Sequence, residues 1–116
     1  MKLLLAEDDP HNRDMLSRRL HRRGYEVLAT EDGQQAVERT LNESPDLILM
    51  DIAMPVLNGW QAMERIRSIR PHLPIIVLSA HSLADDRERA LASGACAYLS
   101  KPVDFDLLLQ TIARHA

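Results

Sequence analysis

Carboxylate side chains stand directly after two short apolar runs of this sequence. Glu7, Asp8 and Asp9 follow the first run, and Asp51 follows another in the middle of the chain. Carboxylates brought together repel one another unless a cation or a proton intervenes, and hard oxygen ligands favour Mg²⁺ or Ca²⁺. Mg²⁺ usually takes one or two carboxylates and a phosphate, which leaves one carboxylate to act as a nucleophile that forms an aspartyl phosphate. These residue types could therefore carry out metal-assisted phosphoryl transfer.

A plainer explanation exists for the first acidic group. Glu7, Asp8 and Asp9 could be acids at a helix N-terminus, stabilised by the helix dipole, and taken alone so short a motif favours that interpretation. Ser79 and Lys101 shift the balance, because a hydroxyl and an ammonium that follow two other apolar segments could hold phosphoryl oxygens. Each has its own alternative, since Ser79 could cap a helix and Lys101 could be a solvated surface lysine.

The lysine usage favours a role for Lys101. The chain has twelve arginines but only two lysines, Lys2 and Lys101. Arginine and lysine differ in that lysine carries a compact point charge, which suits a phosphoryl oxygen. In so arginine-rich a chain, a lysine at position 101 favours a role for a compact ammonium there, although one or two lysines could also occur by chance.

Alternating strand and helix patterns must position these side chains. Continuous apolar runs are typical of strands buried on both faces, as in a parallel sheet, and helical periodicity fills the gaps between them. Asp9 and Pro10 predict the N-cap and first residue of the first helix, and Gly94 predicts the end of the fourth. The runs are Leu3–Ala6, Leu47–Met50 and Ile75–Leu78, with weaker strand candidates at Tyr25–Ala29 and Ala97–Leu99. In the first helix Met15, Leu16 and Leu20 are predicted to face inward. Further helices are predicted from the patterns Ala36, Val37, Thr40 and Leu41, then Gly59, Met63, Ile66 and Ile69, then 82–93, and then Leu107, Leu108, Thr111 and Ile112.

Five strand–helix units predict an α/β fold in which a doubly wound parallel sheet has helices on both faces. Ligands of such sheets bind beyond the carboxyl ends of the strands, where the strand order reverses. If the first and third strands are neighbours there, Glu7, Asp8 and Asp51 converge on one crevice.

Composition narrows the class of protein. The 116 residues are enough for one domain with its own core, and we expect a single domain over 1–116. The net charge of −3 gives no bulk attraction to nucleic acid, and no stretch approaches membrane-spanning length. The single cysteine, Cys96, fits a reducing compartment, so we expect a cytoplasmic protein that binds neither nucleic acid nor membrane.

Four segments together resemble the receiver domain of two-component response regulators. They are LLLAEDDPHNR, LILMDIAMPVLNGW, IIVLSAH and AYLSKP, and the similarity covers essentially the whole chain. The resemblance implies a flavodoxin-like (βα)5 fold with strand order 2-1-3-4-5. It also implies a phosphorylation switch, not a metabolic enzyme, that receives its phosphoryl group from a histidine kinase or a histidine phosphotransfer protein.

The same resemblance implies a role for each matching residue. Asp51 would be the phosphoacceptor. Glu7 and Asp8 would be the acidic pair that binds Mg²⁺, Asp8 directly and Glu7 through water, and Asp51 and the backbone carbonyl of Ala53 would complete the protein ligands. Ser79 and Lys101 would bind the phosphoryl oxygens, with Pro102 following Lys101 through a cis peptide bond. After transfer Ser79 would move toward the phosphoryl group, and Tyr98 would swing from a solvent-facing rotamer into the vacated space. Tyr98 could instead be an ordinary aromatic residue of an edge strand.

Two positions would tune the lifetime of the phosphorylated state. Ala53 stands two residues after Asp51, and His81 stands two residues after Ser79, although a plain surface histidine is the favoured interpretation of His81.

The main alternative function is a phosphatase-like hydrolase with an aspartate nucleophile, but such enzymes usually carry a second acid where Ala53 stands. A flavodoxin-like cofactor binder would need a phosphate-cradling loop, whereas EDDPHN is acidic and lacks glycine. The cognate kinase, the downstream target and the length of the natural protein do not follow from these residues.

Overall fold

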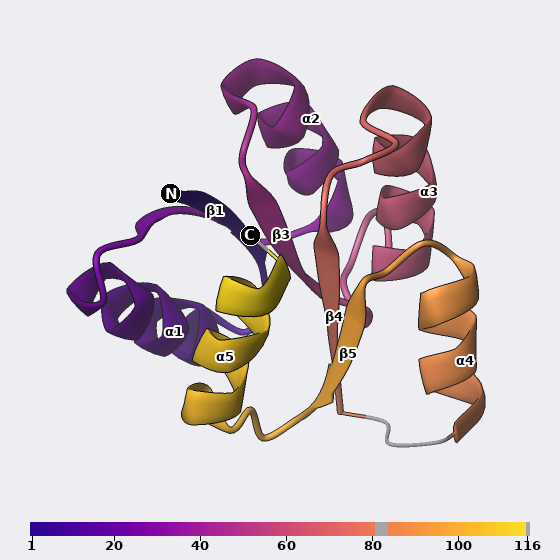
Figure 1. Cartoon of the computed structure of the whole chain (residues 1–116). Coiled ribbons are helices and arrows are strands. Elements are labelled where there is room, and N and C mark those ends of the chain that lie inside the picture. Colours follow the sequence, from indigo (N-terminus) through magenta and orange to yellow (C-terminus); the bar gives the residue numbers. More distant parts are fainter. Residues whose placement is uncertain (81–83, 116) are drawn as a thin grey trace.

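The computed structural model describes residues 1–80 and 84–115, and its centre is a five-stranded parallel sheet (Figure 1). The strand order is β2-β1-β3-β4-β5, which confirms the predicted flavodoxin-like arrangement. Strand β1 has β2 on one side and β3 on the other. The acids that follow β1 and the acid that ends β3 can therefore converge, as predicted. The strands are β1 (Lys2–Ala6), β2 (Glu26–Thr30), β3 (Leu47–Asp51), β4 (Ile75–Ser79) and β5 (Ala97–Ser100).

Helices cover both faces of this sheet, with α1 and α5 on one face and α2, α3 and α4 on the other (Figure 1). The helices are α1 (Pro10–Arg22), α2 (Gly33–Glu43), α3 (Gly59–Ile69), α4 (Ala84–Ala92) and α5 (Phe105–His115). The fourth helical pattern was predicted over 82–93, and its first two positions lie outside the described residues. No described helix is both long enough and apolar enough to cross a bilayer.

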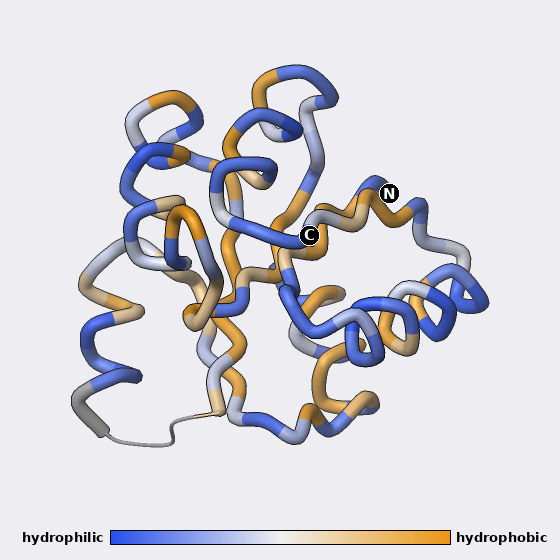
Figure 2. Tube along the Cα trace, turned by 180° about the vertical axis from the view of Figure 1, so that it is seen from behind, coloured by the Kyte–Doolittle hydropathy of each residue, from blue (hydrophilic) through white to orange (hydrophobic). Residues whose placement is uncertain are grey.

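Two hydrophobic cores arise because successive residues of a strand point to opposite faces. In β1, Leu4 and Ala6 join the core beneath α2, α3 and α4, whereas Leu3 and Leu5 join the core beneath α1 and α5. Figure 2 shows hydrophobic colour concentrated in the central strands, whereas hydrophilic and hydrophobic colours alternate along the helices. The continuous apolar runs are thus explained by burial on both faces.

Asparagine and aspartate side chains set the start of three helices. Asp9, Asp32 and Asn58 are the N-caps of α1, α2 and α3, and each accepts a hydrogen bond from a backbone N–H of the first turn. Such caps satisfy donors that the helix itself leaves unpaired, at a typical gain of about 1 kcal/mol each. The predicted cap and first residue of α1 are confirmed, and so is the predicted end of α4, where Gly94 has φ +101°.

One predicted inward position is wrong, because Met15 exposes 38% of its surface. Two other apolar residues of the helical patterns, Leu41 and Leu107, expose 46% and 47%. Each is adjacent in sequence to a residue that does face the sheet, about 100° away around the helix, so the buried stripe is narrower than the apolar pattern. Strand β2 also begins and ends one residue later than predicted, because Glu26 to Thr30 pair with Lys2 to Ala6.

Candidate functional site

The carboxyl ends of β1, β3, β4 and β5 carry the polar residues singled out in the sequence. The register pairs Ala6 with Met50, so Glu7 and Asp51 take the next positions on adjacent strands. It also pairs Ser79 with Ser100, which places Lys101 just beyond the end of β5. One edge of the sheet therefore gathers side chains that are far apart in the sequence.

Three carboxylates converge at this edge, as predicted. One oxygen each from Glu7, Asp8 and Asp51 lie within 4.8 Å of one another. Glu7 and Asp51 are buried, with 1% and 3% of their surface exposed, whereas Asp8 is exposed at the mouth of the crevice. Two buried acids next to each other must be offset by positive charge or by a proton.

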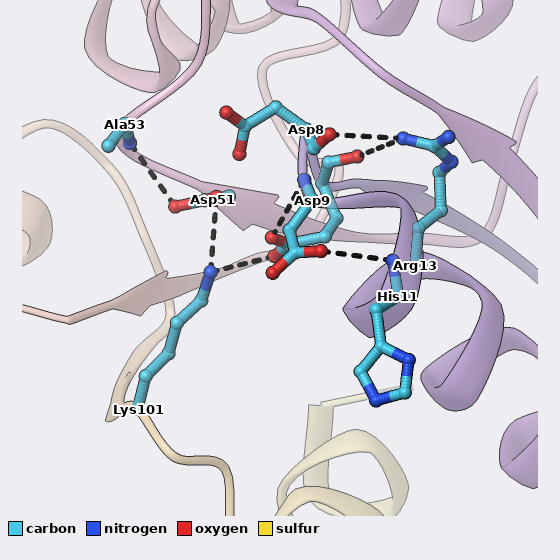
Figure 3. A network of polar contacts seen from close by, with 8 residues as sticks. Asp8, Asp9, His11, Arg13, Asp51, Ala53 and Lys101 are labelled. Carbon is cyan, nitrogen blue, oxygen red and sulfur yellow. Dashed lines mark hydrogen bonds and ion pairs between the residues drawn. The ribbon is translucent and has the colours of Figure 1, made fainter.

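Lys101 supplies positive charge in this structure. Its Nζ donates to Glu7 Oε2 at 2.7 Å and to Asp51 Oδ2 at 3.1 Å, as Figure 3 shows for the Asp51 contact. The Lys101 side chain is only 17% exposed, so the solvated surface lysine considered above does not describe it. Its backbone N–H donates to the Ser79 carbonyl oxygen at 2.7 Å, and its peptide bond to Pro102 is cis, the geometry that the resemblance implies.

The pKa values reflect this crowding. Burial, followed by the charge of Glu7, raises the pKa of Asp51 from 3.8 to about 6, although Lys101 and the Ala53 N–H act in the opposite direction. Burial lowers the pKa of Lys101, but the hydrogen bond from Lys101 to Glu7 and the charges of both carboxylates outweigh it, so the net shift is upward. Asp51 is thus poorly stabilised as an anion, which is the condition that a bound cation would relieve.

The loop after β3 completes the surroundings of Asp51. The Ala53 N–H donates to Asp51 Oδ1 at 3.2 Å, and Ala53 itself is exposed beside the acids (Figure 3). Gly59 holds this loop against the strand, because its N–H donates to the Ile52 carbonyl at 2.9 Å. A Cβ at Gly59 would lie 2.4 Å from the Asp51 carbonyl oxygen, so the close approach requires glycine.

Ser79 and Tyr98 lie near the site but differ in how they meet the predictions. Ser79 ends β4 and is buried with 3% of its surface exposed. Tyr98 is paired with Val77 in the sheet and is buried at 7% exposure within the core that α4 covers. The solvent-facing Tyr98 rotamer expected before phosphoryl transfer is therefore not the one found here, because the ring packs into an apolar core that favours burial. His81 lies outside the described residues.

The donor set fits a hard divalent cation. The three side chains offer carboxylate oxygens, which Mg²⁺ and Ca²⁺ prefer over nitrogen or sulfur. An exposed Asp8 beside two buried acids leaves the crevice open on one side, where a phosphoryl donor could approach. The arrangement can hold a cation and present the Asp51 carboxylate as a nucleophile.

Arg13 also belongs to this site, although no role was predicted for it from the sequence. Its Nη1 donates to the backbone carbonyl oxygens of Glu7 at 2.9 Å and Asp8 at 3.4 Å (Figure 3). The available signal is positional: Arg13 stands four residues after the N-cap Asp9, and helical side chains lean toward the helix N-terminus. That direction carries the guanidinium back over the acidic loop.

Comparison with known proteins agrees with this geometry. The family model for the response regulator receiver domain matches residues 3–113. The sensor histidine kinase RcsC of Salmonella typhimurium is 36% identical over 116 residues, which is 100% of this chain and 12% of RcsC. This chain thus spans about an eighth of that relative.

Solved structures give the same picture. The receiver domain of sensor histidine kinase PA1611 from Pseudomonas aeruginosa, solved with a magnesium ion coordinated in the active site cleft, is 38% identical with a TM-score of 0.91, over 98% of this chain and 95% of that one. The response regulator protein TrrA from Thermotoga maritima, solved in complex with Mg(2+)-BeF, is 29% identical with a TM-score of 0.89, over 99% and 98%.

Proposed function

Because this chain belongs to the family of response regulator receiver domains of two-component systems, we propose that Asp51 accepts a phosphoryl group from the phosphohistidine of a kinase or phosphotransfer protein. The observation that carries the proposal is the buried Asp51 carboxylate, which shares one crevice with Glu7, Asp8 and Lys101. The role of the domain is signalling, and a chemical change at Asp51 would be the signal.

The transfer would be a displacement at phosphorus. A carboxylate oxygen of Asp51 attacks phosphorus, and an O–P bond forms as the N–P bond of the phosphohistidine breaks. The imidazole leaves with the electron pair of that bond and takes a proton from solvent. Positioning and electrostatics carry most of such a reaction, because the phosphoryl group needs little covalent assistance.

The acidic residues would hold the metal ion. Glu7, Asp8 and Asp51 offer carboxylate oxygens within reach of one cation, and the Ala53 carbonyl would complete the protein ligands. Bound Mg²⁺ would neutralise charge that the phosphoryl oxygens bring into the crevice. Support for Mg²⁺ over other hard cations comes from the PA1611 receiver domain, which holds magnesium in its cleft.

Lys101 and Ser79 would bind the transferred phosphoryl group. Lys101 already reaches Asp51 Oδ2 at 3.1 Å, so a phosphoryl group on Asp51 would lie close to its ammonium. Ser79 stands at the end of the adjacent strand, where its hydroxyl could donate to a second phosphoryl oxygen. Charged donors make the stronger of these hydrogen bonds, so we assign Lys101 the larger share of the stabilisation.

The switch would be a shift between packings that both exist beforehand. The Tyr98 ring is the inward member of this pair in the structure, with 7% of its surface exposed. We propose that phosphorylation increases the population of the state in which Ser79 lies toward the phosphoryl group and the Tyr98 ring is inward, at the expense of the state with the outward ring. Ala53, and His81 beyond the described residues, would tune the lifetime of the phosphorylated state.

The hydrolase alternative is not favoured. Its second acid would stand at position 53, where the chain has alanine.

We propose further that the 116 residues act as one domain in the cytoplasm. The domain would catalyse only its own phosphorylation and dephosphorylation, and it would bind no nucleic acid. The net charge of −3 supports the last point, because nucleic-acid binding depends on a basic surface.

Phosphorylation with a small donor tests the assignment of Asp51. Incubation with MgCl₂ and acetyl phosphate should add one phosphoryl group, seen in the intact mass and released by hydroxylamine, as an acyl phosphate requires. Asp51→Asn should take up none, whereas Asp14→Asn, which alters an exposed acid of α1, should behave as wild type. Uptake by Asp51→Asn at the wild-type rate would show that another residue is the acceptor.

A further inference from the structure

Arg13 holds the backbone of the loop that carries two of the three candidate metal ligands. Its Nη1 contacts the carbonyl oxygens of Glu7 and Asp8, and its Nη2 lies 3.8 Å from Glu31 Oε2. Glu31 follows β2, and Gln35 of α2 donates to the Glu31 carboxylate at 3.3 Å. Arg13 therefore links the loop after β1 to the loop after β2, on the far side of the acids from Lys101.

The two ligands in this loop depend on its backbone to different degrees. The Glu7 side chain is buried and contacts Lys101, so several contacts fix it. The Asp8 side chain is exposed, so its position follows mainly from the backbone that carries it. Within the described residues, Arg13 provides the side-chain hydrogen bond to the Asp8 carbonyl. A freely moving Asp8 would lose entropy on binding a cation, and that loss would weaken binding.

We infer that Arg13 is a positioning residue for the divalent cation: its guanidinium fixes the Glu7–Asp8 backbone so that the Asp8 carboxylate points at the metal position. The inference rests on the proposed function, since it assumes that these acids bind Mg²⁺. Groups that hold metal ligands in place typically contribute 10- to 100-fold to metal affinity. A contribution of roughly 10-fold is expected here, because one of the two contacts is long at 3.4 Å.

Charge alone predicts the opposite effect. The guanidinium is a cation near a cation site, so its removal would strengthen Mg²⁺ binding if Arg13 acted only through its field. If Arg13 instead orders the loop, its removal weakens binding despite the more favourable charge. The sign of the change in affinity therefore separates the two explanations.

The test is a titration of the protein with MgCl₂ at constant ionic strength, followed through backbone amide chemical shifts. Arg13→Ala should raise the Mg²⁺ dissociation constant about 10-fold. Arg13→Lys keeps the charge but loses the planar fork, so it should restore affinity only in part. Arg18→Ala is the matched control, because Arg18 of the same helix pairs with Asp14 away from the acids, and its dissociation constant should equal that of wild type.

Each outcome bears on one claim. Unchanged or tighter Mg²⁺ binding by Arg13→Ala would overturn the positioning role, as would a fall in the thermal unfolding midpoint with no change in the dissociation constant. Full recovery of affinity in Arg13→Lys would overturn the need for a guanidinium. Failure of the wild-type protein to bind Mg²⁺ would overturn the proposed function itself, which keeps the two failures distinct.

Discussion

Lys101 Nζ lies closer to Glu7 Oε2, at 2.7 Å, than to Asp51 Oδ2, at 3.1 Å, so one ammonium is shared between carboxylates from two strands. The side chains of Glu7 and Asp51 are only 1% and 5% exposed, so water does little to screen their repulsion. In the metal-free protein Lys101 therefore acts as the counter-ion of the acid pair. The residue proposed to bind the phosphoryl group also stabilises the fold before any phosphoryl group arrives.

Replacing Lys101 should destabilise the metal-free protein. Loss of one partner of a buried ion pair typically costs about 3–5 kcal/mol, and uptake of a proton by Asp51 should limit the cost of Lys101→Met to roughly 2–3 kcal/mol. Urea unfolding in EDTA measures this, with Lys2→Met, the other lysine, as the control. MgCl₂ should recover part of the loss, and equal stability of Lys101→Met and wild type in EDTA would contradict the role of Lys101 as counter-ion.

Asp51→Asn should stabilise the metal-free fold at pH 7.5. The amide removes a buried negative charge that burial and Glu7 disfavour, and the gain should be about 1–3 kcal/mol. Urea unfolding in EDTA gives the value, and Asp14→Asn should change the free energy of unfolding by less than about 0.5 kcal/mol because Asp14 is exposed. In MgCl₂ the advantage should shrink, since the wild-type protein gains more from the metal. A loss of stability on Asp51→Asn in EDTA would show that the acids are not crowded.

Acidification should favour the metal-free wild-type fold over the range in which Asp51 titrates. A carboxyl whose folded pKa of about 6 exceeds its ordinary value of 3.8 binds its proton more tightly when folded. Its contribution to stability is fully present below pH 3.8 and is lost as the pH rises through about 6, with a total of at most about 3 kcal/mol. The free energy of unfolding in EDTA, measured between pH 4 and pH 8 for wild type and Asp51→Asn, isolates this contribution as their difference. A difference independent of pH would mean that the pKa of Asp51 is not raised.

Gly59→Ala should impair both stability and phosphorylation. The alanine Cβ would lie 2.4 Å from the Asp51 carbonyl oxygen, so the backbone at Asp51 must shift. This shift should lower the free energy of unfolding by about 1–3 kcal/mol. Acetyl phosphate labelling should slow, because Asp51 would leave its position beside Lys101. Gly24→Ala is the matched control. A Cβ at Gly24 would meet no atom within 4 Å, but its φ of +91° disfavours alanine, so this variant should lose about 1–2 kcal/mol of folding stability without changing the site. Equal labelling rates for the two variants would show that the Gly59 contact does not position Asp51.

Much of the fold could be predicted because burial on both faces leaves a plain sequence pattern. The runs at 3–6, 47–50 and 75–78 are apolar at every position, and each forms a strand of the sheet. The meeting of Glu7, Asp8 and Asp51 then followed from the general rule that parallel strands present their carboxyl ends at one edge. Helix faces were harder, since Met15 and Leu107 are apolar but lie just outside the buried stripe.

Other features of the site could not be predicted from the types of residue in the sequence. Arg13 acts through backbone carbonyls, which every residue has, so no motif announces its partners. The contact of Lys101 with Glu7 spans 94 positions and depends on the course of the chain after β5. The buried ring of Tyr98 differs from the solvent-facing rotamer that the resemblance implied, because the placement of the ring depends on how α4 and β5 pack around it, which residue type does not show.

The division of the interior by the sheet has a consequence for how such a molecule can change over time. Neighbouring residues of one strand, such as Leu4 and Leu5, serve different cores, and no described residue belongs to both. Substitutions on helices of opposite layers should therefore combine additively, because such sites are far apart and share no partners. Because the sheet separates the two helix layers, the outer surface of α1 and α5 can diverge while the packing beneath α2, α3 and α4 stays as it is.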